Sequence, residues 1–364
     1  MAEWADRRIL DLFAIDVPIV QAPMAGATSP DMVIAVSEAG GLGSLGCAML
    51  NAGQLRSELG IIRQRTSRPI NVNFFCHTPP KPAPDRQAAW RKRLAPYYGE
   101  LGLDASKVPD GALRTPFDES LCEVVEEFKP PVVSFHFGLP EHRLMERVRQ
   151  TGAKIICSAT SVAEARELEA AGCDAIIAQG SEAGGHRGMF LSDDVSSQPG
   201  TMALVPQVVD AVGVPVIAAG GIADGRGIVA ALALGAAAVQ IGTAYLFCPE
   251  SKVTALHRAA LGQARDDQTV LTNVFTGRPA RGIVNRLIRE VGPMSADAPQ
   301  FPLAANAAAP LRAAGEERGS TDWSPLWSGQ AAALGHKLGR EIGAGDLTVQ
   351  LAADAAERLR ALSR

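Results

Sequence analysis

The sequence lacks paired cysteines. None of its six cysteines belongs to a CxxC pair, so neither a structural zinc site nor a dithiol redox motif is indicated. Several lie inside apolar runs, such as Cys157 in IICSAT and Cys173 in AAGCDAII, where a free cysteine behaves as a small buried hydrophobic residue. We therefore expect structural thiols in a reducing cytoplasm.

A charge excess and long apolar runs are also missing. The formal net charge of −4 gives no excess of basic residues that would bind nucleic acid. No uninterrupted apolar run approaches the roughly 20 residues of a membrane span. The first residues, MAEWADRRILDLF, lack the apolar core and small-residue cleavage site of a secretory signal. With 47% hydrophobic residues, the composition is that of a soluble globular protein. We expect a cytoplasmic protein with neither nucleic acid nor membrane as a partner.

The sequence motif typical of dinucleotide-binding domains is absent as well. No GxGxxG follows an early strand with an acidic residue about 20 positions further on. This absence argues against FAD, or a tightly held NAD, bound in the Rossmann manner. A mononucleotide such as FMN, held by its single phosphate, remains compatible with the sequence.

What the chain does contain is a regular alternation of two kinds of segment. Eight short runs are nearly continuous in hydrophobicity, as expected for strands covered on both faces of a parallel sheet. They span 17–24, 41–47, 69–75, 132–138, 153–160, 174–180, 215–221 and 237–243. An amphipathic or alanine-rich helical segment follows each, at 30–39, 51–65, 118–128, 140–151, 161–171, 201–211, 224–234 and 251–263. The count favours a closed (β/α)₈ or TIM barrel, an α/β fold, over an open doubly wound sheet.

Two regions interrupt this alternation. Residues 77–117 are proline-rich, then helical, then loop-like, and fall between the third strand and its helix, so we interpret them as an insertion. Residues 264–364 follow the last predicted barrel helix and contain further helices, one of them over about 346–362. We expect a barrel from 1–76 and 118–263. The insertion and the C-terminal region would form a smaller helical second domain that packs beside the barrel and covers its active site.

Polar residues and glycines gather where the predicted strands end, which is where such a barrel builds its active site. The first strand ends in QAPMAG, so Ala22, Pro23 and Met24 lie there. The other positions are Asn73 on the third strand, His136 on the fourth, Gln179, Gly184 and His186 in AQGSEAGGHRG after the sixth, Gly220 and Gly221 after the seventh, and Gln240, Ile241, Gly242 and Thr243 after the eighth.

The ends of the seventh and eighth strands predict a phosphate site. PVIAAGGIADGRG places Gly220 and Gly221 at a strand end, with Asp224 as the N-cap of the next helix. QIGT adds Gly242 and Thr243 as donors. Glycine lets backbone N–H groups approach a phosphate closely, and a helix N-terminus favours an anion. Many barrels bind phosphate after these two strands.

The amides and histidines admit two interpretations each. Gln179 and Asn73 could satisfy neighbouring backbone, the commonest fate of a buried amide, or could bind the N3, O2 and O4 edge of a flavin. Met24 could be plain core, or could present its N–H near the flavin N5. His136 and His186 come from different strand ends, which favours a shared site. No metal site is predicted, because two histidines fall short of the usual three protein ligands.

Taken together, the motifs resemble those of the nitronate monooxygenases, formerly called 2-nitropropane dioxygenases, most closely the class I bacterial type. The similarity continues past the barrel, so it covers nearly the whole chain. Order and spacing make the set specific. The motifs are QAPMAG, GGLGSLG, NVNFFCH, VSFHFG, AQGSEAGGHRG, AAGGIADGRG, AVQIGTAYLFCPES, TGRPARGIVNR and WSGQAAAL.

The resemblance implies an FMN-dependent oxidation of alkyl nitronates by O₂ to nitrite and a carbonyl compound. Propionate 3-nitronate, a plant and fungal toxin, is the expected substrate, so the activity would be a detoxification. His186 would be the catalytic histidine, acting as base or orienting the substrate, and His136 would line the substrate pocket. A monomer or homodimer is expected. The residues that would touch FMN are Ala22, Pro23, Met24, Asn73, Gln179, Gly184, Gly220, Gly221, Gln240, Ile241, Gly242 and Thr243.

One position departs from the family's pattern. Phe301 stands where the resemblance leads us to expect a tyrosine, in a region that is also expected to supply a lysine, so the pocket should differ in polarity. Two alternatives stay open. One is an FMN-dependent NAD(P)H:quinone or enoyl reductase on the same fold. The other is a flavin-free barrel that binds a phosphate ligand, since barrels host many chemistries.

Overall fold

The centre of the molecule is an eight-stranded parallel sheet that curls into a barrel. The computed structural model describes residues 4–81, 83–108, 114–339 and 341–362. A bridge between Val20 and Leu42 joins the two ends of the sheet, so the predicted (β/α)₈ architecture is confirmed. In spatial order the strands are β1 (Ile19–Gln21), β9 (Ala238–Ile241), β8 (Val216–Ala219), β6 (Ala175–Gln179), β5 (Lys154–Ala159), β4 (Val132–His136), β3 (Ile70–Phe75) and β2 (Gly43–Gly46).

The strands are largely hydrophobic because both of their faces are covered. Val132 and Val133 in β4, and Ile155 and Ile156 in β5, are fully buried although successive side chains point to opposite faces. One face fills the barrel interior and the other packs under helices. The continuous apolar runs therefore predict the strand positions well, and all eight strands lie within the ranges expected from sequence.

The helices around the barrel begin at recognisable caps. The side chains of Ser29, Asn51, Asp118 and Ser161 accept hydrogen bonds from first-turn N–H groups of the helices that they precede. The helices of this outer ring are α2 (Pro30–Glu38), α3 (Ala52–Arg65), α5 (Glu119–Phe128), α6 (His142–Gln150), α7 (Val162–Ala170), α8 (Thr201–Ala211) and α9 (Gly225–Ala233), and α1 (Arg8–Phe13) adds Ile9, Leu10 and Phe13 to the barrel core.

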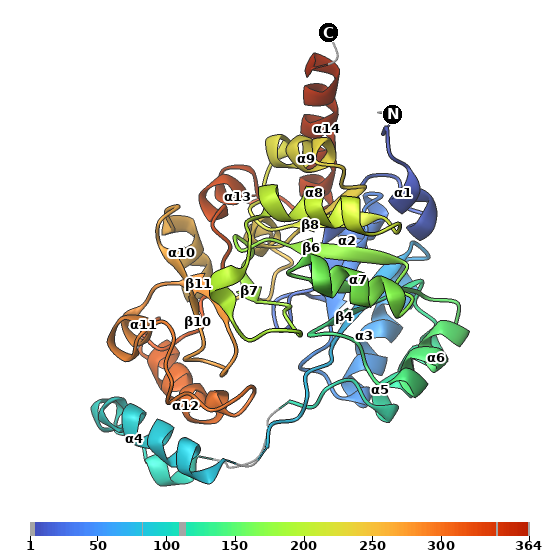
Figure 1. Ribbon diagram of the computed structural model, residues 1–364. Helices are drawn as coiled ribbons and strands as arrows, with labels where there is room; N and C mark the ends of the chain where they lie inside the picture. Colours follow the sequence, from blue (N-terminus) through green and yellow to red (C-terminus); the bar gives the residue numbers. More distant parts are fainter. Residues whose placement is uncertain (1–3, 82, 109–113, 340, 363–364) are drawn as a thin grey trace.

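The eighth position of the ring belongs to the C-terminal helix, which differs from the expectation. Helix α14 (Ala344–Leu362) packs between α9 and α2 (Figure 1), and its Leu347, Leu351 and Ala355 join the barrel core. These residues are spaced four apart, so they form one buried helix face. The segment expected to be the eighth helix corresponds to α10 (Ala255–Gln263), which buries only Leu261 and contacts α13 (Ala332–Gly339) instead.

A second hydrophobic core joins the insertion to the C-terminal region. Helix α4 (Pro84–Leu101) lies against α12 (Ala304–Glu317) at the lower left of Figure 1. The Trp90 indole donates to the Ala304 carbonyl at 3.1 Å, and the Tyr98 hydroxyl to that of Ala307 at 2.7 Å. Helix α11 (Arg286–Val291) completes this core. This core defines a smaller second unit of the fold, and α14, which was expected to belong to it, packs on the barrel instead. None of the described helices is both long enough and apolar enough to cross a bilayer.

A three-stranded antiparallel sheet, not expected from sequence, connects the second unit to the barrel. It consists of β10 (Thr269–Thr272), β11 (Ala280–Ile283) and β7 (Gly185–His186), and pairs His186 with Ala280. The two-residue strand β7 lies within AQGSEAGGHRG. This pairing fixes the backbone that carries His186.

Candidate active site

A cavity of about 430 Å³ lies at the carboxyl ends of the barrel strands. The second unit covers it with Thr276, Trp327 and part of α12. Ile241 is the one predicted site residue outside its lining, because its side chain is fully buried in the barrel wall. The predicted residues that do line the cavity are Ala22, Pro23, Met24, Asn73, His136, Gln179, Gly184, His186, Gly220, Gly221, Gln240, Gly242 and Thr243.

The His186 side chain lies among aromatic rings. Its ring centroid is 5.4 Å from those of both Phe301 and Trp327, and 6.0 Å from that of Phe75. Its Nε2 is 2.9 Å from the Thr276 hydroxyl oxygen. These neighbours come from both the barrel and the second unit, so the site is complete only when the two parts pack together.

Burial and nearby positive charge keep the His186 imidazole neutral. Desolvation is the largest cause, and the positive charge of Arg114 is the largest electrostatic one. Together with the charge of Arg278 they lower the pKa of His186 well below 6.5. Both causes disfavour the protonated ring. At neutral pH one ring nitrogen therefore carries a free electron pair.

His136 is tied to the protein through both ring nitrogens. Its Nδ1 is 3.0 Å from the Ser158 hydroxyl oxygen, and its Nε2 is 3.2 Å from the His186 carbonyl oxygen. Burial lowers the pKa of His136 to about 3, so a neutral ring donates through Nε2–H to that carbonyl and accepts at Nδ1 from Ser158. In this structure His136 holds the backbone of the loop AQGSEAGGHRG.

The two amides are also engaged within the protein. Gln179 donates to the His186 carbonyl at 3.0 Å and accepts from the Gly188 N–H at 2.7 Å. The Asn73 amide nitrogen lies 2.9 Å from the Ser134 hydroxyl oxygen. Of the two interpretations open at the sequence level, these contacts match satisfaction of neighbouring protein groups. Gln179 thereby fixes both sides of the segment that carries His186.

Arg187 and Glu182 brace the same loop. Arg187 is fully buried and donates to the carbonyls of Gly180 and Gln179 and to the Gln198 side chain, each at 2.7 Å. Burial lowers its pKa to about 10. The Glu182 carboxylate accepts from the N–H and hydroxyl of Thr201 at the first turn of α8. Neither residue is available for catalysis.

Gly184 makes room for another chain segment. A Cβ atom at this position would lie 2.4 Å from the Gly329 nitrogen, so a side chain cannot fit while the WSGQ segment is docked. The Gly329 N–H in turn donates to the Thr243 hydroxyl at 2.9 Å. The docked segment therefore takes the room on one side of Gly184, while Gly184 also lines the cavity. Its contact with FMN stays a prediction.

The strand-end glycines retain the features of a phosphate cradle. Gly220 and Gly221 have φ of +116° and +70°, values that glycine adopts without a steric penalty. The N–H groups of Gly220, Gly221, Gly242 and Thr243 find no acceptor in the described part of the chain. Four unpaired N–H donors beside one cavity suit an anion such as a phosphate.

The N-terminus of α9 does not contribute to this cradle, contrary to the expectation from sequence. Asp224 accepts from the N–H groups of Arg226 and Gly227, and Asp354 of α14 accepts from that of Gly225 at 2.9 Å. Two carboxylates therefore occupy the positive end of the helix dipole. Asp224 acts as the predicted N-cap, but the helix end is closed to a ligand.

Two further groups have unsatisfied polar atoms that fit a heterocyclic ligand. The Gln240 Oε1 atom is buried without a hydrogen-bond partner and belongs to the cavity lining. The Met24 N–H also lacks an acceptor among the described residues. Buried polar atoms are nearly always paired, so the Gln240 Oε1 atom points to a missing partner, and the Met24 N–H is a free donor in the cavity lining. The described side chains hold no cluster of three or more His, Cys, Asp or Glu suited to a metal ion.

Comparison with known proteins gives the family. The family model described as "Nitronate monooxygenase" matches residues 6–354. The chain belongs to the nitronate monooxygenase family. It is 41% identical over 333 residues to a nitronate monooxygenase of Pseudomonas aeruginosa, covering 91% of this chain and 95% of that protein. Because it belongs to this family, the protein is an oxidoreductase.

Solved structures agree with this assignment. A nitroalkane oxidase from Streptomyces ansochromogenes superimposes with a TM-score of 0.87 at 40% identity, covering 98% of this chain and 99% of that one. FabK from Thermotoga maritima gives a TM-score of 0.74 at 30% identity, covering 98% of each chain. The similarity to the first structure includes both the barrel and the second unit.

Sequence reasoning missed several lining residues of this family member. Arg114, Thr276 and Trp327 all line the cavity, yet they come from the insertion and the C-terminal region. No strand-end pattern marks such positions, since only tertiary packing brings them to the barrel. The motifs TGRPARGIVNR and WSGQAAAL, which contain Thr276 and Trp327 and carry part of the family resemblance, were the available signal, and nothing local indicated Arg114.

Proposed function

We propose that this family member is an FMN-dependent nitronate monooxygenase that oxidises alkyl nitronates with O₂ to nitrite and a carbonyl compound. The observation that carries the proposal is a neutral His186 in the same cavity as an unpaired set of glycine N–H groups. The names of two relatives, a nitronate monooxygenase and a nitroalkane oxidase, support substrates of this class. Propionate 3-nitronate is the first candidate.

FMN fits the unsatisfied groups of the cavity. The N–H groups of Gly220, Gly221, Gly242 and Thr243 would hold its phosphate, and the Met24 N–H and Gln240 Oε1 would meet polar atoms of its ring. When bound, FMN supplies the electron acceptor for oxidation of the substrate. No such acceptor exists among amino-acid side chains, so the proposed chemistry needs this group.

The proton chemistry belongs to His186. The Thr276 hydroxyl donates to the Arg278 carbonyl at 3.4 Å, so we assign Nε2–H of His186 as donor to Thr276 and Nδ1 as the free base. That nitrogen takes the α-proton of a neutral nitroalkane and orients a nitronate that is already an anion. The surrounding rings of Phe75, Phe301 and Trp327 exclude water from the reacting atoms.

Oxygen uptake with propionate 3-nitronate tests the function. We expect O₂ consumption together with nitrite release in the presence of the nitronate, and none with NADH alone. The 30% identity to FabK motivates the reductase alternative, for which anaerobic NADH would rapidly bleach the flavin while the nitronate gives no uptake. A colourless protein without flavin absorbance would refute both. The cytoplasmic location and the monomeric or homodimeric state stay predictions.

A further inference from the structure

Arg114 is a cavity-lining cation without an acidic partner. It lies in the loop before α5 and is largely shielded from solvent, and burial lowers the pKa of its guanidinium. No carboxylate among the described residues forms an ion pair or a hydrogen bond with it. The positive charge of Arg312 also lowers the pKa of Arg114, because two like charges repel each other. A guanidinium remains charged in proteins, so the fold keeps an uncompensated positive charge here.

The other basic side chains of the cavity are paired. Lys252 lies 3.1 Å from a carboxylate oxygen of Glu58, and Arg312 lies 2.8 Å from one of Glu316. Their charges are balanced within the protein. Among the described lining residues, Arg114 is therefore the cation that a ligand can engage without breaking an ion pair.

Arg114 and His186 share a neighbour. The guanidinium carbon of Arg114 is 5.9 Å from the centre of the Phe301 ring, and the His186 ring centre is 5.4 Å from the same point. Of the nearby charges, that of Arg114 lowers the pKa of His186 most. The cation and the base therefore both lie near Phe301, and both line the same cavity.

A second cation strengthens the positive potential of this part of the cavity. The Arg278 guanidinium lies 4.1 Å from the centre of the Phe137 ring and donates to the Met189 carbonyl. It also acts on His186 through its charge. Two guanidinium groups around a neutral imidazole attract an anion, and the low dielectric of a buried site makes the attraction stronger than in water.

We propose that Arg114 is the residue that binds the negatively charged group of the substrate and so selects nitronates over neutral nitroalkanes. The proposal rests on the proposed function for the identity of the substrate. A guanidinium presents parallel N–H donors that match the two oxygens of a planar oxyanion. Arg114 holds the oxyanion of the nitronate, and His186 orients the substrate, which has already lost its α-proton.

Nitrate binding tests the proposal without turnover. Nitrate is a planar oxyanion, and its dissociation constant is measured by calorimetry on the FMN-loaded protein at constant ionic strength. We expect Arg114→Met to weaken nitrate binding about ten- to a hundred-fold, the usual range for losing one charge-assisted hydrogen-bonded contact. Arg114→Lys keeps the charge and should restore part of the loss.

A control variant distinguishes the loss of a contact with the anion from the loss of one positive charge on the protein. Arg143→Met removes one positive charge from the outer face of α6, where Arg143 pairs with Glu119, and should leave nitrate binding unchanged. The proposal is overturned if the unaltered protein shows no saturable nitrate binding. It is also overturned if Arg114→Met binds nitrate normally, or if Arg143→Met loses as much affinity.

Steady-state kinetics give the second readout. For Arg114→Met the KM for ethyl nitronate should rise with the same factor as the nitrate dissociation constant, while the KM for neutral nitroethane changes less. Equal changes for both substrates would contradict a role in selecting the anion. If the unaltered protein oxidises neither substrate, the proposed function fails, and the nitrate titration still decides whether Arg114 binds an oxyanion.

Discussion

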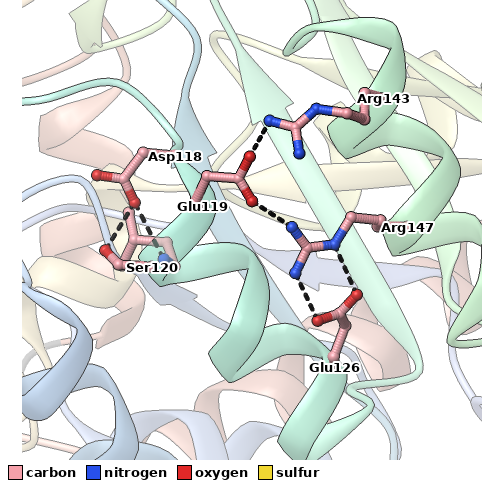
Figure 2. Close-up of polar contacts among 7 residues, drawn as sticks. Asp118, Glu119, Ser120, Glu126, Arg143 and Arg147 are labelled. Atoms are coloured by element: carbon pink, nitrogen blue, oxygen red, sulfur yellow. Dashed lines mark hydrogen bonds and ion pairs between the residues drawn. The ribbon is translucent and has the colours of Figure 1, made fainter.

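Charged side chains on the outer face of α5 and α6 differ in their partners from Arg114 and His186 in the cavity. On the outer face, the Arg147 guanidinium lies between Glu119 and Glu126, and Arg143 contacts Glu119 from the other side (Figure 2). Every charge in this group has a partner of opposite sign. In the cavity, Arg114 has no such partner among the residues that the structure describes, and His186 is neutral.

The difference separates stability from function. Exposed ion pairs contribute little to stability, because water solvates the separated charges nearly as well. A shielded cation without a partner opposes folding, so a methionine at position 114 would serve the fold at least as well. A group that the fold does not need, held where a ligand can reach it, indicates recognition of that ligand.

The largest expected effect is on catalysis by His186. His186→Asn removes the base, so kcat/KM for nitroethane should fall about 10²- to 10⁴-fold, the usual contribution of a positioned general base. Ethyl nitronate has already lost its α-proton, so its oxidation should fall far less. Both values come from oxygen-uptake kinetics. Equal losses on the two substrates would show that His186 does not act as a base.

An intermediate effect is expected for the pH dependence of stability. The pKa of His136 is about 3 in the folded state and about 6.5 in an unfolded chain. Between these values the unfolded state binds the extra proton, so stability falls as the pH drops below 6.5. Each pH unit in this window costs about 1.4 kcal/mol for one such histidine.

Urea unfolding at pH 7.5 and pH 5.5 measures this dependence. The cavity also contains other histidines with lowered pKa values, so every variant loses some stability at low pH. The quantity to compare between variants is therefore the change of unfolding free energy with pH. His136→Gln should reduce the loss of unfolding free energy between the two pH values, whatever its effect at pH 7.5. His142→Gln, on the exposed start of α6, serves as the control and should keep the original slope.

The smallest effect is expected on the outer face of the barrel. Arg147→Met breaks the contacts with Glu119 and Glu126, but Arg143 still neutralises Glu119. The Tm should change by at most about 2 °C, and oxygen uptake with propionate 3-nitronate should stay the same. A large loss of stability would mean that the charges on this face are as important to the fold as the hydrophobic core.

Local patterns predicted much of the barrel and the positions of the site residues on it. A strand buried on both faces is apolar at most positions, so segments such as β8 (Val216–Ala219) can be recognised without knowing their neighbours. Strand ends are then recognised by where the apolar run stops, which located His136 and Gly220. The N-cap at Asp224 could be identified in the same way.

Side-chain partners could not be predicted this way. Gln179 stands at the expected strand end, yet its amide faces the His186 carbonyl and the Gly188 N–H and not a ligand. Asp354, far along the chain, closes the end of α9. The Gln179 contacts depend on how the loop folds back onto its strand, and the Asp354 contact joins residues 129 apart in sequence. No sequence period reports either arrangement.

By itself, the sequence determined the eight strands, the helices between them and the loop AQGSEAGGHRG that carries His186. Each of these follows from interactions within a few residues. Tertiary structure alone decided that α14 completes the helical ring, that β10 and β11 align His186, and that Arg114 reaches the cavity. These three features arise from packing between distant segments, where burial of apolar surface and backbone pairing select one arrangement.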